Sequence, residues 1–234
     1  MKITDILTES YLEEETLEEL TGIKNVVKDM PHNPRRYDDF PLGTDWHKLL
    51  YNNGFRALGS GSFGTVWDNP NLPYVLKVFT DQDRAYIDWI NTARQHSDNP
   101  HMPHFVSPRA MRIVPGVMAV RMEKLTRINQ EAYNLIRPIN ALVENSIRTK
   151  LLPSEIVKHL IDNRDPGAAE PAPDTFYAYA QKYLDLVPAL DIICQFIKKS
   201  GYRNDLHDEN IMMRGDTMVF TDPVFDRAAL SNRQ

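Results

Sequence analysis

The order of the predicted elements limits the fold of this 234-residue chain more than any single motif does. Short runs rich in β-branched and aromatic residues predict strands, over 55–58, 65–67, 74–79, 110–114 and 117–122. Between the third and fourth runs, residues 83–95 carry apolar side chains at helical spacing, with Asp83 as candidate N-cap. After residue 125, helical spacing predominates, over 128–151, 154–161 and 175–200. The sequence therefore predicts an α+β fold, in which a small antiparallel β lobe with one helix precedes a mostly helical lobe.

Single residues mark the ends of these elements. Pro115-Gly116 predicts a hairpin turn, and Ser154 is a candidate cap for the helix over 154–161. Pro188 is expected to kink or split the last long helix, and Gly201 stands at its C-cap position.

The first 45 residues differ in composition from the rest of the chain. Seven acidic residues and no basic one lie between Thr4 and Gly22, and prolines interrupt the segment that follows. We therefore expect three parts, namely an extension of short helices and a linker over 1–45, the β lobe over 46–125, and the helical lobe over 126–234.

Composition excludes several classes of protein. A single cysteine, Cys194, forms no internal disulfide and lies in an apolar helical pattern, so we expect a small buried side chain and a reducing, cytoplasmic setting. No uncharged apolar run is long enough to span a membrane, and the N-terminus lacks the apolar core of a signal peptide. The net charge of −5 argues against direct binding to nucleic acid. The oligomeric state stays open.

Three glycines form the first candidate site. Gly59, Gly61 and Gly64 fit the spacing G-x-G-x-x-G-x-V, which ends at Val66. The pattern continues into a strand rather than a helix, which is typical of a lid over a nucleotide and not of a dinucleotide-binding turn. The alternative is a glycine-rich hairpin that binds nothing.

Lys77 is the second candidate. It stands among apolar residues in the predicted strand over 74–79, where burial of its charge is costly unless an anion meets it. The alternative is a lysine on the solvent face of an edge strand.

The third candidate lies near the C-terminus. Asp205 and Asn210 fit the spacing D-x-x-x-x-N, and Asp222 follows after a predicted hairpin turn over 214–216. Such an acid can accept a proton from an attacking hydroxyl, while amide and carboxylate oxygens are ligands that Mg²⁺ prefers. The alternative is an acidic surface loop.

In this order, the three patterns resemble the protein-kinase-like superfamily, and more closely the early serine/threonine protein kinases of T-odd bacteriophages. The resemblance covers residues 46–228 and rests on Gly54-Phe55, the glycine motif, Leu72-Pro73 before Lys77-Val78, Asn210-Ile211-Met212 and Thr221-Asp222-Pro223-Val224. It implies a bilobal kinase-like fold with a truncated helical C-lobe, and transfer of the γ-phosphate of ATP to a hydroxyl of host or viral proteins, with Mg²⁺ as cofactor.

The resemblance also implies residue roles. Gly59, Gly61 and Gly64 would cover the phosphates, and Val66 would contact the nucleotide. Lys77 would bind the α- and β-phosphates, Met122 would be the gatekeeper, and backbone groups of Glu123 and Leu125 would meet the adenine edge. Asp205 would be the catalytic base, and Asn210 and Asp222 would bind Mg²⁺.

Several departures from the kinase pattern keep two other functions open. The helix after Lys77 contains no glutamate, so its carboxylate partner is open between Asp83 and Asp88. His207 resembles the aminoglycoside-kinase pattern, which favours a small-molecule kinase. The sequence continues only from Asp222 to Gln234, so we expect no activation segment and no control by its phosphorylation. The missing glutamate and the acidic arm favour a pseudokinase that acts as a binding module.

Three closely spaced histidines raise the question of a zinc site. His96, His101 and His104 are interspersed with Asp98, Asn99 and two prolines. That composition favours an exposed loop over a zinc site.

Overall fold

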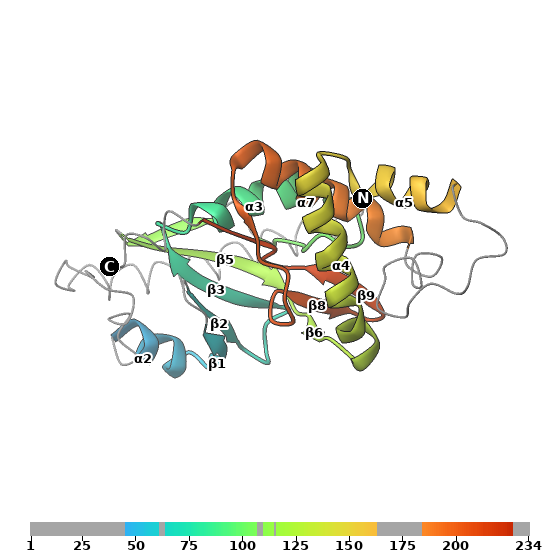
Figure 1. The fold of residues 1–234 in the computed structure, drawn as a ribbon. Helices are drawn as coiled ribbons and strands as arrows, with labels where there is room; N and C mark the ends of the chain where they lie inside the picture. The colour runs from blue at the N-terminus through green and yellow to red at the C-terminus, as the bar shows by residue number, and fades with distance from the viewer. Residues whose placement is uncertain (1–44, 61–63, 107–109, 115, 163–183, 227–234) are drawn as a thin grey trace, which may run out of the picture. The chain divides into compact units, whose positions relative to one another are not determined.

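The computed structural model describes residues 45–60, 64–106, 110–114, 116–162 and 184–226 (Figure 1). Apart from Asp45, the extension predicted over 1–45 lies outside the described residues. Contacts divide the chain into two compact units. Unit 1 comprises Met1–Gln82 and Val106–Met122, and unit 2 comprises Asp83–Phe105 and Glu123–Gln234.

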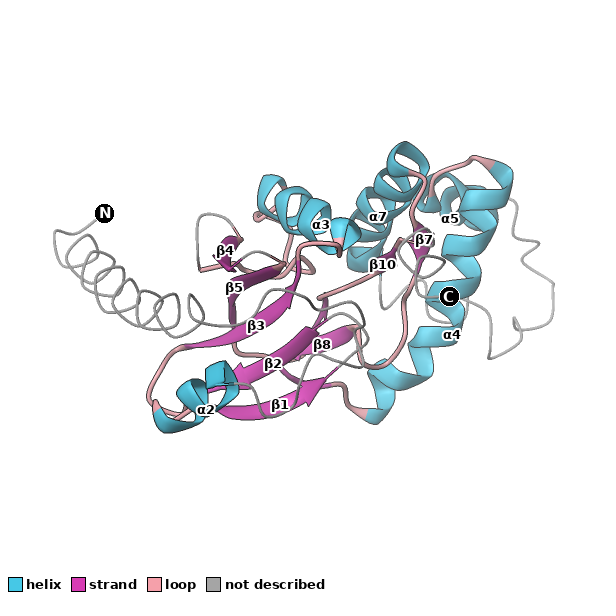
Figure 2. Cartoon of the chain, turned by 90° about the vertical axis from the view of Figure 1, so that its left-hand side faces the viewer, coloured by secondary structure: helices cyan, strands magenta, loops and turns pink. Residues whose placement is uncertain are grey.

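Unit 1 contains a five-stranded sheet in the order β1-β2-β3-β5-β4, which Figure 2 shows as adjacent magenta arrows. The pairs β1–β2, β2–β3 and β4–β5 are antiparallel. The strands are β1 (Arg56–Ser60), β2 (Gly64–Asp68), β3 (Tyr74–Thr80), β4 (Met111–Val114) and β5 (Val117–Glu123). All five predicted strands are thus confirmed, with no end shifted by more than two residues. The hairpin predicted between the last two is also confirmed, with Gly116 at a φ of 87°, while Pro115 lies outside the described residues.

A short helix, α2 (Asp45–Asn52), precedes the sheet and packs against β2. The His47 ring lies 5.2 Å from the Trp67 ring, centroid to centroid, and both side chains are buried. Beyond the helix, the Asn69 amide donates to the Asn53 carbonyl at 3.0 Å, next to Gly54 at a φ of 84°. A positive φ is easily adopted only by glycine, so Gly54 permits the turn from α2 into the sheet.

Unit 2 is mostly helical. Its helices are α3 (Arg84–Gln95), α4 (Gln130–Thr149), α5 (Pro153–Asp162), the 3₁₀ helix η2 (Leu184–Leu186) and α7 (Val187–Ser200). Two small sheets accompany them, a three-stranded one in the order β6-β8-β9 and an antiparallel pair β10-β7. The strands are β6 (Thr126–Arg127), β7 (Arg203–Asn204), β8 (Ile211–Arg214), β9 (Thr217–Phe220) and β10 (Val224–Phe225).

The predicted helices are confirmed wherever the structure describes them. The helices expected over 83–95, 128–151 and 154–161 correspond to α3, α4 and α5. The helix expected over 175–200 is present as α7 in its second half, while residues 175–183 lie outside the described part of the chain.

The helix ends follow local chemistry. The Asp83 carboxylate accepts from the Tyr86 N–H at 3.1 Å and caps α3 as predicted, and Gly201 closes α7 at a φ of 77°. Ser154 was wrongly predicted as the cap of α5: Pro153 is the first residue of this helix, and the Ser154 N–H donates to Asp191. Pro188 lies in the first turn of α7, where its missing N–H costs nothing, so α7 starts there instead of kinking.

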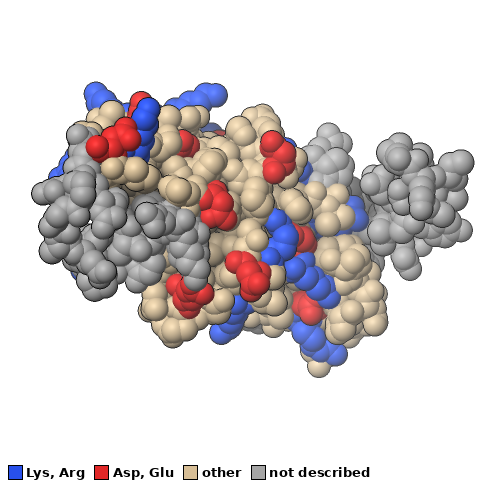
Figure 3. Space-filling view, turned by 90° about the vertical axis from the view of Figure 1, so that its right-hand side faces the viewer, with Lys and Arg blue, Asp and Glu red and all other residues tan. Residues whose placement is uncertain are grey.

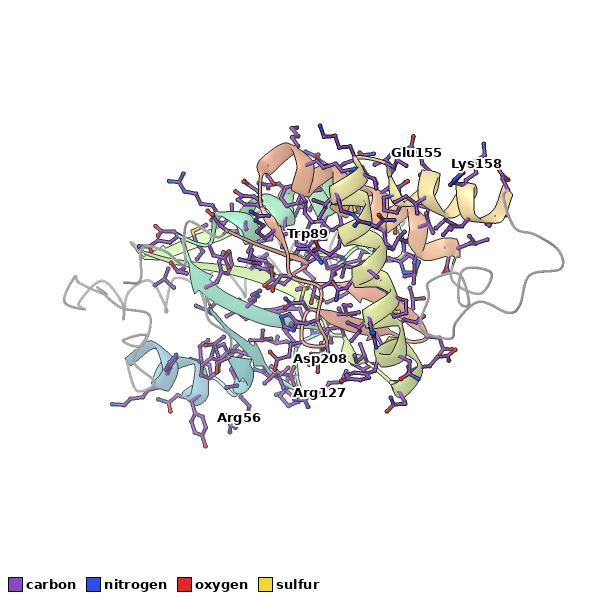
Figure 4. The ribbon with its side chains drawn as sticks, in the orientation of Figure 1. Arg56, Trp89, Arg127, Glu155, Lys158 and Asp208 are labelled. Atoms are coloured by element: carbon purple, nitrogen blue, oxygen red, sulfur yellow. The ribbon has the colours of Figure 1, made fainter. Side chains whose placement is uncertain are left out.

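The core of unit 2 forms where the helices pack together. Trp89, labelled in Figure 4, is fully buried on α3, and its ring lies 5.8 Å from that of Phe196 on α7. Apolar residues at helical spacing line the buried faces of α4 and α7: Leu135, Ile139, Leu142, Val143, Leu190, Ile193, Cys194 and Ile197. The predicted burial of Cys194 is confirmed.

The α+β class is confirmed, with a strand-rich unit followed in sequence by a mostly helical one. The expected boundary at residue 125 lies close to the division at 122/123, and α3 belongs by its contacts to unit 2. None of the described helices combines the length and apolarity needed to cross a membrane.

Candidate functional site

Three residues of the candidate nucleotide site lie in one row across the sheet of unit 1. Gly59 on β1 pairs with Val66 on β2, and Val66 pairs with Lys77 on β3. Directly opposite residues of antiparallel strands share a face of the sheet. The register therefore brings Gly59, Val66 and Lys77 together on one face.

The position of Lys77 excludes its alternative interpretation. β3 is the central strand of the five, with neighbours on both sides, and Lys77 is half-buried between buried residues. Lys77 is therefore not on an edge strand. A charged side chain in this position has to meet hydrogen-bonding or anionic partners.

The glycines differ in what surrounds them. A Cβ atom at Gly64 would lie 2.4 Å from the Val78 carbonyl oxygen and 2.8 Å from the Phe79 Cβ, so close packing of β2 on β3 itself requires glycine there. At Gly59, no heavy atom of the described part of the chain lies within 4 Å of such a Cβ. Gly61 lies outside the described residues. Close packing of β2 on β3 explains why residue 64 is glycine. At Gly59, in contrast, the missing side chain leaves open space above the sheet, which a ligand can approach.

The residues predicted to face adenine lie at the end of β5 and just after it. Met122 is buried, and the Glu123 N–H donates to the His104 carbonyl at 3.0 Å. The Glu123 carboxylate accepts from Arg214 through two nitrogens and from the His104 N–H at 2.7 Å. The Glu123 side chain is thus occupied by contacts within the protein. Leu125 lies in the connection from β5 to β6.

The loop after β7 carries Asp205. Its N–H donates to the Pro223 carbonyl at 2.9 Å, next to the pairing of Asn204 with Val224 between β7 and β10. The Asp205 side chain is 38% exposed, so its carboxylate is accessible to solvent.

Asn210 closes this loop back onto Asp205. Its Nδ2 donates to the Asp205 carbonyl at 2.8 Å and to the Asp205 carboxylate at 3.0 Å, and it also lies 2.8 Å from Nε2 of His207. Because the carbonyl and the carboxylate of Asp205 both accept from Nδ2, the opposite amide atom, Oδ1, is the one that can serve a metal ion.

The backbone of Asn210 also holds the segment that carries Asp222. The Asn210 carbonyl accepts from the Thr221 N–H at 2.9 Å, from the Thr221 hydroxyl at 3.0 Å and from the Asp222 N–H at 3.5 Å. Asp205, Asn210 and Asp222 are thus brought together by hydrogen bonds within unit 2. Their carboxylate and amide oxygens are a donor set that fits Mg²⁺, which prefers hard oxygen ligands.

The two carboxylates considered as partners of Lys77 have other contacts. Asp83 caps α3 and is buried, and Asp88 accepts from the Tyr202 hydroxyl at 2.7 Å. Burial, together with that bond to Asp88, raises the pKa of Tyr202, so the phenol stays protonated.

The segment 96–104 differs from the exposed loop that its composition predicts. His101 is only 2% exposed, because its Nδ1 lies 2.8 Å from the Met218 carbonyl and its Nε2 lies 3.3 Å from Asp185. The prediction of an exposed loop is wrong for His101. Among the described residues, no cluster of three or more His, Cys, Asp or Glu is arranged to hold a metal ion.

Arg214 links distant segments and was not predicted. Besides Glu123, it donates to the carbonyls of Pro100 at 2.7 Å and Met102 at 2.9 Å. Glu123 and Arg214 stand far apart in the sequence, so no local pattern announces their pairing.

On the face drawn in Figure 3, acidic and basic side chains lie scattered among uncharged ones over the part of the surface that the structure describes.

Comparison with known proteins gives one kind of match. No family model and no curated protein matches the sequence. Solved structures that match include the ternary complex of streptomycin, ATP and APH(2″)-IIa, with 15% identity over 82% of this chain and 74% of that one, at a TM-score of 0.31.

Proposed function

We propose that the chain is an ATP- and Mg²⁺-dependent phosphotransferase that phosphorylates a hydroxyl group. The observation that carries the proposal is the hydrogen-bonded group of Asp205, Asn210 and Asp222. The solvent-accessible carboxylate of Asp205 accepts a hydrogen bond from Nδ2 of Asn210. The backbone carbonyl of Asn210 in turn accepts from the segment that carries Asp222. An acidic surface loop without function needs no such arrangement.

In phosphate transfer, the residues of the chain would have the following roles. Asp205 would accept the proton of the attacking hydroxyl and orient its oxygen. Lys77 would bind phosphate oxygens, and Gly59 would allow close approach of the backbone because it lacks a side chain. Asn210 and Asp222 would hold Mg²⁺, which neutralises charge on the phosphate oxygens when bound. Met122 and the backbone of Glu123 and Leu125 would bind adenine.

We propose a serine/threonine protein kinase of the bacteriophage type as the first assignment, with host or viral proteins as acceptors. The similarity of the motifs over 46–228 supports it. A small-molecule kinase is the second candidate, and His207, which has the aminoglycoside-kinase position two residues after Asp205, favours it. A pseudokinase is the third candidate, since α3 contains no glutamate.

Transfer of ³²P from [γ-³²P]ATP to a bacterial protein extract, and separately to a set of hydroxylated metabolites and aminoglycosides, tests these alternatives. We expect Asp205→Asn to lower transfer about 10²- to 10⁴-fold, as expected for loss of a general base. The matched control is Asp208→Asn, which removes a carboxylate of the same loop that is 57% exposed and should leave transfer unchanged. Equal transfer by Asp205→Asn and the unchanged protein would refute the role of Asp205, and the labelled product distinguishes the first two candidates.

A further inference from the structure

We infer that Asn140 on α4 is a positioning residue for Asp205, a conclusion that rests on the proposed function. The strand β7, which precedes the loop that carries Asp205, lies beside α4 (Figure 2). The Asn140 Nδ2 donates to the Leu206 carbonyl at 2.5 Å, and its Oδ1 accepts from the Asn204 Nδ2 at 2.8 Å. One amide of α4 thus binds the residue on each side of Asp205.

Two further contacts complete this group, which we call the α4 clamp (Asn140, Glu144, Asn204 and the Leu206 backbone). The Asn204 Nδ2 also donates to Glu144, one helical turn along α4 from Asn140, at 3.0 Å. The Asn204 Oδ1 accepts from the Leu206 N–H at 3.2 Å. In both Asn140 and Asn204, the side-chain nitrogen therefore donates and the side-chain oxygen accepts. Because amides are planar, these bonds fix the orientation of the loop relative to α4 as well as its distance.

The clamp determines where Asp205 can point. Asn204 belongs to β7, whose backbone is extended, so neighbouring side chains alternate in direction. Asn204 binds α4, and Asp205 instead interacts with Asn210. Because Asn204 and Leu206 are both held by α4 and the Asp205 N–H is held by Pro223, little rotation of the loop remains possible.

The clamp thus holds the residues on both sides of Asp205 through two side-chain amides, one carboxylate and the Leu206 backbone. A small displacement of a reacting group lowers rates steeply, by about 10²-fold for 1 Å. Loss of the clamp should therefore lower turnover while the binding of ATP, in which the proposed function gives Asn140 no part, is kept.

The test compares Asn140→Ala with Asn134→Ala, a matched control that removes an exposed asparagine of the same helix. We expect Asn140→Ala to lower kcat about 10- to 100-fold with an unchanged KM for ATP. In the Asp205→Asn background, Asn140→Ala should cause no further loss, because its effect passes through Asp205. The inference would be overturned if Asn140→Ala left kcat unchanged, or if it lowered kcat by the same factor in both backgrounds.

A second readout does not depend on activity. Amide hydrogen exchange of the peptide over 203–210 should be faster in Asn140→Ala than in the unchanged protein and in Asn134→Ala, at an equal Tm. If the rate of amide hydrogen exchange over 203–210 were unchanged in Asn140→Ala, the conclusion that α4 holds this loop would be wrong. If the unchanged protein transfers phosphate to no acceptor, the proposed function and the catalytic role of Asn140 both fail, and hydrogen exchange still decides whether α4 holds the loop.

Discussion

Gly59 and Gly64 belong to one motif but have different surroundings, which makes them a matched pair for mutagenesis. Gly64→Ala places a methyl group against the backbone of β3, and overpacking of this kind typically costs about 1–3 kcal/mol in the free energy of unfolding. Gly59→Ala meets no described atom within 4 Å and should change stability by less than about 0.5 kcal/mol while weakening Mg·ATP binding. Chemical denaturation and nucleotide titration of both variants measure these effects. If Gly59→Ala and Gly64→Ala lowered the free energy of unfolding equally, the different roles given to the two glycines would be contradicted.

Cys194 offers a test of the core of unit 2. Burial raises the pKa of its thiol to about 11, so the reactive thiolate is scarce at neutral pH. We predict that a thiol reagent such as DTNB labels the native protein slowly and the protein in denaturant rapidly. Rapid stoichiometric labelling of the folded protein would show that α7 does not bury this face.

His47 should make stability depend on pH. Burial lowers the pKa of the His47 ring, so the folded state favours the neutral form, while the unfolded chain binds a proton near the ordinary value of 6.5. As the pH falls below about 6.5, the unfolded state binds more protons, and the free energy of unfolding decreases. His47→Phe keeps a ring against Trp67 and should reduce this decrease between pH 7 and 5.

Denaturant unfolding across that pH range measures the effect, with His159→Gln as control because His159 is exposed on α5. An identical pH dependence for His47→Phe and the unchanged protein would contradict the argument.

Arg214 ties the end of β8 to the end of β5 and to the segment 100–104. Its guanidinium serves the Glu123 carboxylate and two backbone carbonyls at once, a geometry that lysine cannot reproduce. Arg214→Lys should therefore lower the free energy of unfolding by about 1.5–3 kcal/mol, as for loss of hydrogen bonds to charged groups. Arg127→Lys on the exposed strand β6 is the control and should change stability little. Equal stability of the two variants would show that the guanidinium contacts contribute nothing.

The elements of the fold were predictable because their signals are local. Short runs rich in β-branched and aromatic residues located the five strands of unit 1, and helical spacing located α3, α4 and α5. Asp83 and Gly201 correctly marked the ends of two helices. Ser154 failed because Pro153, one residue earlier, begins the helix without needing a side-chain cap.

Contacts between distant residues were not predictable. His101 is buried because Met218 and Asp185, which stand far along the chain in the second half of the sequence, provide its partners. The α4 clamp likewise joins Asn140 to Asn204 and Leu206, which no local spacing connects. The motif spacing identified Asp205, Asn210 and Asp222 as one group, and it carried no information about the helix that holds their loop.

For the whole molecule, the proposed function requires that Lys77 and Asp222 each contribute to the binding of Mg·ATP. A nucleotide at about 100 times its Kd adds about 2.7 kcal/mol to the free energy of unfolding, so binding is easy to detect.

Calorimetric titration of Mg·ATP into the unchanged protein, Lys77→Ala and Asp222→Ala tests this most directly. The proposal predicts measurable binding by the unchanged protein, and at least tenfold weaker binding by each variant, which corresponds to about 1.4 kcal/mol. Absence of binding by the unchanged protein at millimolar Mg·ATP, or binding that neither substitution weakens, would contradict it.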